Sequence, residues 1–424
     1  MSNAILHKRL TDFLEEGKTA YHAAAASVSF LEAHGYIRLH EGEPFSLCTG
    51  GKYYVTRNGS AVIAFSVGEA VGGFRIVASH LDSPALKLKG NPVISAEGVS
   101  KLNTEPYGGG LYYSWLDIPL QIAGRVVLEK EDGLQVVSIT DPRKLIIPSL
   151  AIHMQRDANK AFSVNPQIDL QPILSLRENA SLDLGGGDCV IAEDLFLVNA
   201  ASPYFVGTSE ELLVSPRIDD LVSVMATLEA IVAKEGGTGV SVAFLADNEE
   251  IGSRTKQGAA SDFLAAVLAE IASGLSVDLR AMLKKSFFVS CDNAHAVHPN
   301  HPEKSDPTNR VRLGGGVVIK HHAGGNYTTD AVSAAIFKSI LKKSRIRCQD
   351  FYMRSDMPCG GTLGAISSMS VSIPSIDIGI PQLAMHAATE TMAIADYDAL
   401  VEALTAFFRT AIEMGDDDAI RLSV

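Results

Sequence analysis

The sequence lacks three features that would each assign it to a class of protein. Its five cysteines are scattered and form no C-x-x-C pair, so we expect reduced thiols of a cytoplasmic protein rather than a disulfide framework. It has no run of about 18 apolar residues and no apolar N-terminal core, so neither a membrane span nor a secretory signal is expected. It has no excess of base. The net charge of −13 makes nucleic acids and anionic membranes unexpected partners.

The features that are present indicate a globular protein with more than one domain. The 424 residues exceed the usual size of one domain, and the 46% of hydrophobic residues is typical of a folded chain. Between residues 92 and 203, short β-like runs alternate with Gly, Pro, Asn and Asp turns, and no long helix is indicated. We therefore expect an α/β domain made of residues 1–91 and 204–424, interrupted by a β-rich domain at 92–203.

Hydrophobic periodicity predicts the elements of both domains. The α/β domain should contain strands at 52–56, 60–67, 74–82, 240–246, 285–292, 315–320 and 374–380, and helices at 4–34, 215–234, 261–273, 330–344 and 395–413. The β-rich domain should contain strands at 119–129, 134–140, 144–148 and 188–198. Buried strands that alternate with amphipathic helices predict a three-layer α/β sandwich.

The stretch VAFLADNEEIGS, residues 242–253, ends an apolar strand in adjacent carboxylates. Glu249 and Glu250 repel each other and resist dehydration at the end of a buried strand. Either they lie in water, as in an ordinary acidic turn, or a positive charge holds them.

Other strand ends carry the same kinds of side chain. In α/β sheets, ligands collect at the carboxyl ends of the strands. The side chains found at or near such ends, or at a following helix start, are His80, Asp82, Asp219, Asp220, Glu249, Glu250, Asp292, His295, His386 and Glu390. Each has a plainer explanation when taken alone: His80 as a surface histidine, Asp219 as a helix N-cap and His386 as a core histidine.

Taken together, these side chains predict a site for two divalent cations. Histidine and carboxylate ligands suit zinc, with cobalt or manganese as alternatives. One glutamate of the adjacent pair can bind a cation while its neighbour handles protons. A metal ion would acidify a water molecule and polarise a carbonyl group, and a free carboxylate would carry the proton to the leaving amine.

The motifs SHLDSP, SPRIDDL, DNEEIGS, CDNAHAVHPN, VIK, PCGGTLG and PQLAMHAATE, in this order, resemble those of the M18 peptidases, the aspartyl aminopeptidases. The resemblance extends over most of the chain, including YGGGLYYSWLD and IPSLAIHMQR in the β-rich domain. It implies a zinc-peptidase-like catalytic α/β domain and removal of an N-terminal Asp or Glu from peptides.

The resemblance also implies a role for each site residue. Asp219 would bridge two metals, with His80 and Asp292 completing one site and Glu250 and His386 completing the other. Glu249 would act as the general base. Asp82 would orient the imidazole of His80.

The substrate contacts that the resemblance implies are His153, His295, Lys320 and Tyr327. Lys320 would face the acidic side chain of the substrate. The β-rich domain would make a dimer contact that carries His153 into a neighbouring active site, within a tetrahedral homododecamer. Gly324, Gly325 and Asn326 depart from the family pattern before Tyr327, which leaves the acidic preference open to a neutral or broad alternative.

Two further interpretations come from other classes of protein. A non-catalytic assembly protein on the same fold would bind no divalent ion, although a chain that had lost its activity would be expected to have lost a ligand. A metal-free hydrolase of sugars that uses a carboxylate pair would leave His80 and His386 unexplained. Cys359 and Lys320 also have simpler interpretations. Cys359 has no base placed beside it by the motif and would not be a nucleophile, and Lys320 would only pair with a nearby acid.

Overall fold

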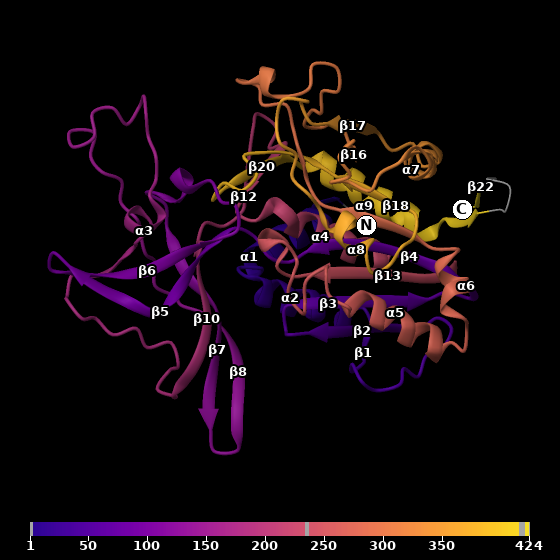
Figure 1. The fold of residues 1–424 in the computed structure, drawn as a ribbon, viewed down its shortest axis with the longest axis horizontal. Coiled ribbons are helices and arrows are strands. Elements are labelled where there is room, and N and C mark those ends of the chain that lie inside the picture. The colour runs from indigo at the N-terminus through magenta and orange to yellow at the C-terminus, as the bar shows by residue number, and fades with distance from the viewer. Residues whose placement is uncertain (1–2, 234–236, 415–419, 424) are drawn as a thin grey trace.

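A nine-stranded sheet forms the centre of the larger domain in the computed structural model, which describes residues 3–233, 237–414 and 420–423 (Figure 1). The strand order is β1-β2-β3-β13-β4-β14-β18-β16-β17. The bounds are β1 (Ile37–Arg38), β2 (Lys52–Arg57), β3 (Ala61–Val67), β13 (Thr238–Ala246), β4 (Ala70–His80), β14 (Phe287–Cys291), β18 (Ser375–Gly379), β16 (Val317–His321) and β17 (Cys348–Tyr352). The central strands β13, β4, β14 and β18 run parallel to their neighbours in this group.

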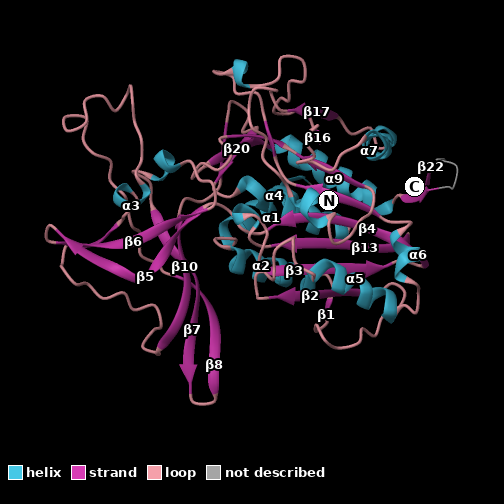
Figure 2. Cartoon of the chain, viewed as in Figure 1, coloured by secondary structure: helices cyan, strands magenta, loops and turns pink. Residues whose placement is uncertain are grey.

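Helices cover both faces of this sheet (Figure 2). One face packs against α1 (Asn3–Glu16), α2 (Ala20–Ala33), α4 (Ile218–Val232), α7 (Ala331–Lys343) and α9 (Ile394–Arg409). The other face packs against α5 (Phe263–Gly274), α6 (Leu279–Leu283) and α8 (Leu363–Ser367). In β13, Ala243 and Leu245 enter the first core while Val242 and Phe244 enter the second, as the two-residue period of a strand requires. The predicted three-layer α/β sandwich is confirmed.

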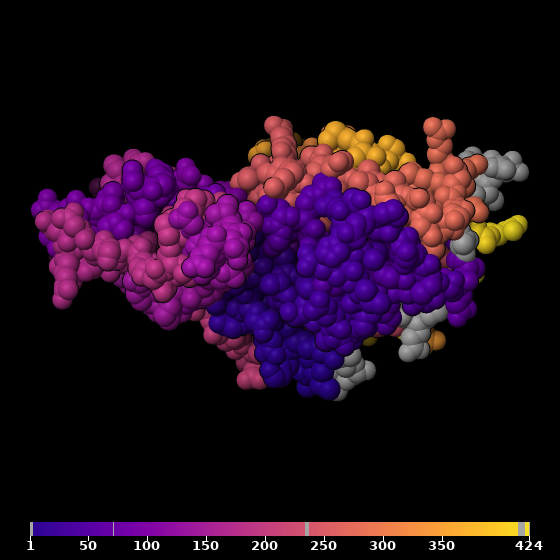
Figure 3. All heavy atoms as spheres, turned by 90° about the horizontal axis from the view of Figure 1, so that it is seen from below, coloured from indigo at the N-terminus to yellow at the C-terminus, as the bar shows by residue number. Residues whose placement is uncertain are grey.

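A six-stranded antiparallel sheet forms a lobe beside the larger domain (Figures 1 and 3). Its order is β8-β7-β10-β5-β6-β9, with bounds β8 (Gly133–Thr140), β7 (Leu120–Lys130), β10 (Val190–Asn199), β5 (Ala85–Ala96), β6 (Val99–Tyr107) and β9 (Ile173–Ser175). The lobe has its own apolar core around Trp115, Ile122 and Leu197. Its only described helices are the short α3 (Pro166–Asp169) and the 3₁₀ turn η1 (Tyr112–Trp115). The predicted boundary at residue 92 falls inside β5.

A five-stranded sheet connects the lobe to the larger domain and carries His386 in one of its loops. Its order is β11-β12-β20-β19-β15, with bounds β11 (Tyr204–Val206), β12 (Leu212–Ser215), β20 (Glu390–Ala393), β19 (Pro381–Leu383) and β15 (Ala294–His295). The chain ends in the hairpin of β21 (Ala411–Met414) and β22 (Ile420–Ser423), and η3 (Pro302–Lys304) is a surface 3₁₀ turn. No helix in the described ranges is long and apolar enough to cross a membrane.

Several local predictions differ in detail from the structure. Residues 4–34, which were expected to be helical, form two helices separated at Gly17, where a Cβ atom would approach Leu221 Cδ1 to 2.8 Å. Two other predictions failed. Residues 144–148 form isolated β-bridges instead of a strand, and residues 411–413 form part of β21 rather than the end of a helix. The pair β5 and β6 was not expected, because turn residues interrupt its apolar pattern.

Asp194 of β10 ties the lobe to the larger domain. Its carboxylate pairs with Lys87 (3.0 Å) and Arg125 (2.9 Å) and accepts a hydrogen bond from the Tyr21 hydroxyl of α2 (3.2 Å). Arg125 also lies over the Tyr21 ring and donates to the carbonyl of Asn58 (2.8 Å). Burial raises the pKa of Asp194, but Lys87 and Arg125 outweigh it and hold the pKa below its usual range.

We predict that Asp194→Asn lowers the free energy of unfolding by about 1 kcal/mol, because the pair is only partly buried. A carboxyl group with a depressed folded pKa contributes stability above its unfolded pKa of about 4 and loses it only as the pH falls through the folded pKa. The difference between variant and wild type should therefore be equal at pH 5 and pH 7 in urea unfolding. Asp188→Asn, which removes an exposed pair with Lys130, is the matched control and should have almost no effect. An equal loss in both variants would contradict the role of Asp194.

Candidate metal centre

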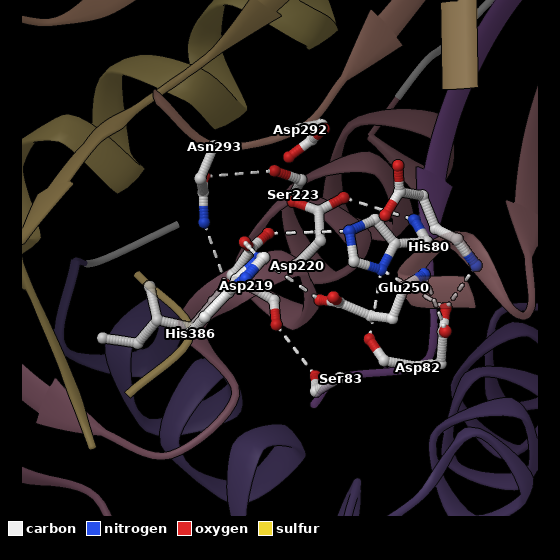
Figure 4. A network of polar contacts seen from close by, with 12 residues as sticks. His80, Asp82, Ser83, Asp219, Asp220, Ser223, Glu250, Asp292, Asn293 and His386 are labelled. Carbon is white, nitrogen blue, oxygen red and sulfur yellow. Dashed lines mark hydrogen bonds and ion pairs between the residues drawn. The ribbon is translucent and has the colours of Figure 1, made fainter. Parts of the chain in front are cut away.

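Three neighbouring parallel strands end at one edge of the nine-stranded sheet. β4 ends at His80, which lies opposite Ala246 of β13, and β14 ends one residue before Asp292. The 3₁₀ turn η2 (Glu249–Ile251) follows β13 and carries both adjacent glutamates. Acidic and histidine side chains from segments far apart in the sequence therefore meet at one place (Figure 4).

The ligand atoms of these residues form overlapping groups. One atom each from His80, Asp219 and Asp292 lie within 4.8 Å of one another, and the same holds for Asp219, Glu250 and His386. Asp219 Oδ1 lies 3.5 Å from His80 Nε2, and its Oδ2 lies 3.4 Å from His386 Nε2. Asp219 thus stands between the two groups, with one oxygen facing each.

The donors in these groups fit a metal ion. Asp219 Oδ1 and Glu250 Oε1 are buried and accept no hydrogen bond within the described part of the chain. The nitrogen–oxygen distances of 3.4–3.6 Å that join them to the histidines are longer than good hydrogen bonds. Two ligands of a tetrahedral zinc ion are separated by about 3.3 Å when each bond is 2.0–2.1 Å long. The residues therefore fit a zinc-like cation better than direct pairing with one another.

Glu390 holds the backbone of two of these residues. Its Oε2 accepts the N–H of Asp219 (2.9 Å), and its Oε1 accepts the N–H of His386 (2.7 Å). The carbonyl of Asp219 accepts a hydrogen bond from Ser83 (2.8 Å), and the peptide bond to Asp220 is cis. Glu390 is one of the predicted acids near a strand end, but no role was expected for it. Its position four residues after His386, at the start of a strand, was the available signal.

Asp82 fixes both His80 and the glutamate turn. His80 Nδ1 lies 3.1 Å from the carbonyl of Asp82 and 3.4 Å from its Oδ1, which leaves Nε2 facing Asp219. The carboxylate of Asp82 accepts the N–H groups of Glu249 (3.0 Å) and Glu250 (3.2 Å). One acid therefore orients the histidine and turn η2 together.

The lobe contributes one wall of the site. Tyr107, the last residue of β6, donates its hydroxyl to Asp82 (2.7 Å). Gly108 has φ +75°, and a Cβ atom there would lie 3.0 Å from Glu250 Cβ, so the close approach favours glycine. The carbonyl of Gly109 lies 3.2 Å from His386 Nδ1. This contact orients the imidazole of His386 from the side of the lobe.

The electrostatics of the site show an excess of buried acid. Burial raises the pKa of Glu249 to about 7, His80 opposes that rise, and Asp292 adds to it. Burial also raises the pKa of Glu250. For His386, burial lowers the pKa, but Asp219 and Glu250 outweigh it and raise the pKa to about 10. Positive charge therefore stabilises this cluster.

The implied substrate contacts fall into two sets. Lys320 is 2% exposed, lies 3.5 Å from Asp292 and 5.1 Å from the centre of the Tyr327 ring, and donates to the carbonyl of Asn293 (3.1 Å). Burial lowers the pKa of Lys320, but the neighbouring acids, Asp292 first among them, outweigh it and raise the pKa. His295 follows three residues after Asp292, and its exposed ring lies 6.2 Å from that of Phe351.

His153 lies apart from this set. It is exposed in the segment of the lobe between β8 and α3 and belongs to none of the ligand groups.

A three-layer α/β domain with a histidine and carboxylate cluster at the carboxyl edge of its parallel strands has the architecture of a metal-dependent hydrolase. The comparisons with known proteins agree with this class. The family model described as "Aminopeptidase I zinc metalloprotease (M18)" matches residues 13–188 and 187–408. The chain therefore belongs to peptidase family M18, a family of metallo-aminopeptidases, and the predicted family resemblance is confirmed. This membership weighs against the alternative of a metal-free hydrolase of sugars.

Individual relatives cover nearly the whole chain. A probable M18 family aminopeptidase 2 of Clostridium novyi is 41% identical over 413 residues, which are 92% of this chain and 95% of that protein. A chain in the cryo-EM structure of the Ape4 and Nbr1 complex is 32% identical, with a TM-score of 0.91 over 96% of this chain and 86% of that one. The Saccharomyces cerevisiae mApe1 dodecamer is 26% identical, with a TM-score of 0.81 over 96% of both chains.

We predict that Zn²⁺ stabilises chelator-treated protein by about 2.7 kcal/mol at a hundredfold excess over Kd, measured by thermal unfolding. Asp219→Asn should abolish most of this gain, because Asp219 belongs to both ligand groups. Asp398→Asn, which removes a pair with His7, should keep the gain. A wild type that folds but gains no stability from Zn²⁺, Co²⁺ or Mn²⁺ would favour the non-catalytic assembly protein.

Proposed function

We propose that the protein is a dinuclear-metal aminopeptidase that removes an N-terminal residue, preferably Asp or Glu, from peptides. The observation that carries this proposal is the pair of ligand groups that share Asp219. His80 and Asp292 would hold one ion with Asp219, and Glu250 and His386 would hold the other. The bound ions would acidify water and polarise the scissile carbonyl group.

We propose zinc as the resident metal, with cobalt or manganese as alternatives. The description of the matching family supports zinc. We also propose a cytoplasmic location, for which the five free cysteines are the support.

Glu249 is the proposed general base. One of its carboxylate oxygens lies within 4.8 Å of the ligand atoms of His80 and Glu250, close enough to exchange a proton with water in the site. Asp82 holds the Glu249 backbone through its N–H, which keeps the carboxylate at the edge of the ligand groups. Glu249 would accept a proton from the attacking water and deliver it to the leaving amine.

We predict that Glu249→Gln reduces turnover of peptide substrates by about 10²-fold or more, because it removes the general base and keeps the shape of the side chain. Metal content, measured by elemental analysis, should remain that of the wild type. Glu250→Gln is the matched comparison and should lose metal, since Glu250 shares a ligand group with Asp219 and His386, which Glu249 does not. A Glu249→Gln variant with full activity would disprove the assigned role.

Lys320 is the proposed partner of the acidic substrate side chain. Its cation is buried beside Tyr327 and shares its charge with Asp292, so a substrate carboxylate would have to compete for it. A cation in a dehydrated pocket favours a carboxylate over a neutral side chain. If the ion pair with Asp292 prevents Lys320 from binding a substrate carboxylate, the enzyme would have neutral or broad specificity instead.

We predict that the wild type cleaves peptides that begin with Asp or Glu faster than peptides that begin with Leu. Lys320→Met should reduce this preference in kcat/KM by about tenfold to hundredfold, the usual worth of a hydrogen bond to a charged group. Lys338→Met, which removes a surface pair with Asp350, is the control. If the wild type prefers Leu, the acidic preference is disproved while the peptidase class remains.

We propose a tetrahedral homododecamer of dimers, in which residues 92–203 form the dimer contact and His153 enters a neighbouring active site. The lobe exposes Leu150 (62%), Ile152 (47%) and Met154 (79%) around His153, which is costly for an isolated surface. The relative mApe1 is a dodecamer. Residues 1–91 and 204–424 would form the catalytic domain.

Mixing two inactive variants tests the shared site. We predict that His153→Ala and Glu249→Gln are each impaired but recover activity when they are dissociated and reassembled together, because some sites then combine an intact His153 with an intact Glu249. Ile168→Ala in the same lobe is a control for surface changes. No recovery in assemblies that mass spectrometry shows to be mixed would contradict a His153 acting across subunits.

A further inference from the structure

Asp377 is a buried acid that the proposed mechanism does not use. It lies in β18 at 0% exposure, and Lys320, which interacts with it electrostatically, forms its ion pair with Asp292 instead. Its Oδ2 accepts the N–H (2.6 Å) and the hydroxyl (2.8 Å) of Thr328, and its Oδ1 accepts the hydroxyl of Thr362. The N–H of Thr328 can only donate, so the position requires an acceptor there, and the two threonine hydroxyls complete the set by donating to the same carboxyl group.

These hydrogen bonds join two segments that are distant in the sequence. Thr328 belongs to residues 321–330, called here the tyrosine segment, and Thr362 belongs to residues 355–364, the glycine segment. Gly364 lies so close to Asp377 that a Cβ atom would approach both carboxylate oxygens to 2.9 Å. The N–H of Asp377 also donates to the hydroxyl of Thr329 (2.9 Å).

Asn326 forms a second connection between the same segments. Its Nδ2 donates to the carbonyls of Cys359 (2.7 Å) and Gly360 (3.1 Å). This residue is one of those that depart from the family pattern before Tyr327. Tyr327 therefore lies between two anchored neighbours, Asn326 and Thr328, with its buried ring 5.1 Å from Lys320 Nζ.

We propose that Asp377 is a positioning residue for the pocket that receives the side chain of the substrate's first residue. Through Thr328 and Thr362 it holds the tyrosine and glycine segments as one wall, and Asn326 fastens the outer edge of that wall. This inference rests on the proposed function, since it assigns the wall to the substrate pocket beside Lys320. Asp377 touches neither the metal ligands nor the reacting atoms. It acts through the segments it holds and, at longer range, through its electrostatic interaction with Lys320.

Threonine substitutions disturb the connection less than Asp377→Asn, because that change alters the acceptor that both segments share. Thr328→Val and Thr362→Val each remove one hydroxyl and keep the shape of the side chain. Each should raise KM for Asp-initiated peptides by about tenfold and leave kcat within about twofold, because a hydrogen bond to a charged group is lost away from the reacting atoms. Thr328→Ser and Thr362→Ser should restore KM. Thr405→Val, which removes a hydroxyl bonded to the Val401 carbonyl in α9, is the matched control.

The reactivity of Cys359 gives a readout that does not depend on activity. Loosening the wall should speed alkylation of Cys359 by about tenfold relative to the exposed Cys48, measured for each peptide by mass spectrometry, because local opening governs access. Asn326→Ala lies at the outer edge of the wall and should give the same acceleration, even if the threonine variants fail to fold.

The outcomes separate this inference from the proposed function. Unchanged KM and unchanged Cys359 reactivity in the valine variants would overturn the positioning role, as would a fall in kcat accompanied by loss of metal. Normal Cys359 reactivity in Asn326→Ala would overturn the outer connection. A wild type without aminopeptidase activity would instead disprove the proposed function, and the Cys359 rates would still test whether Asp377 holds the two segments together.

Discussion

The structure depends on the concentration of buried carboxylates at the carboxyl edge of the sheet. These acids fall into two kinds. The carboxylate oxygens of Asp82 and Glu390 accept hydrogen bonds from backbone N–H groups, so these oxygens are satisfied without a cation. Asp219 and Glu250 each keep a buried oxygen that no described group satisfies. Through these hydrogen bonds, acids of the first kind position the backbone of acids of the second kind. This difference in hydrogen bonding explains why so many acids can lie close together in the site.

The lobe lies beside the cluster of acids and also contributes residues that contact it. Tyr107 bonds to Asp82, Gly108 makes room for Glu250, and the Gly109 carbonyl orients His386. The contacts of Asp194 with Arg125 and Tyr21 then fix the lobe against the larger domain. A rotation of the lobe would therefore move His386 and the wall beside Glu250 together. The geometry of the site depends on the junction of the two parts.

The sequence predicted the larger domain well because its signals are local. Apolar strands that alternate with amphipathic helices define the layers, and parallel strands must end at a common edge, so His80 and Asp292 could be expected to meet. The role of Glu390 could not be read this way, because it depends on the N–H groups of Asp219 and His386, which only the folded backbone brings to it. The helix break at Gly17 could not be read this way either, since the crowding of that position by Leu221 exists only in the folded chain. Long-range packing decided each of these features.

The wall formed by the tyrosine and glycine segments shows how such long-range contacts can change the interpretation of a sequence feature. Gly324, Gly325 and Asn326 depart from the family pattern before Tyr327, and they left the acidic preference open when the sequence was considered alone. In the folded chain, Asn326 binds the carbonyls of the glycine segment and Asp377 anchors Thr328, so the segment is held on both sides of the tyrosine. Hydrogen bonds made by the residues on either side of Tyr327 therefore set its position, which the sizes of the residues before it do not reveal.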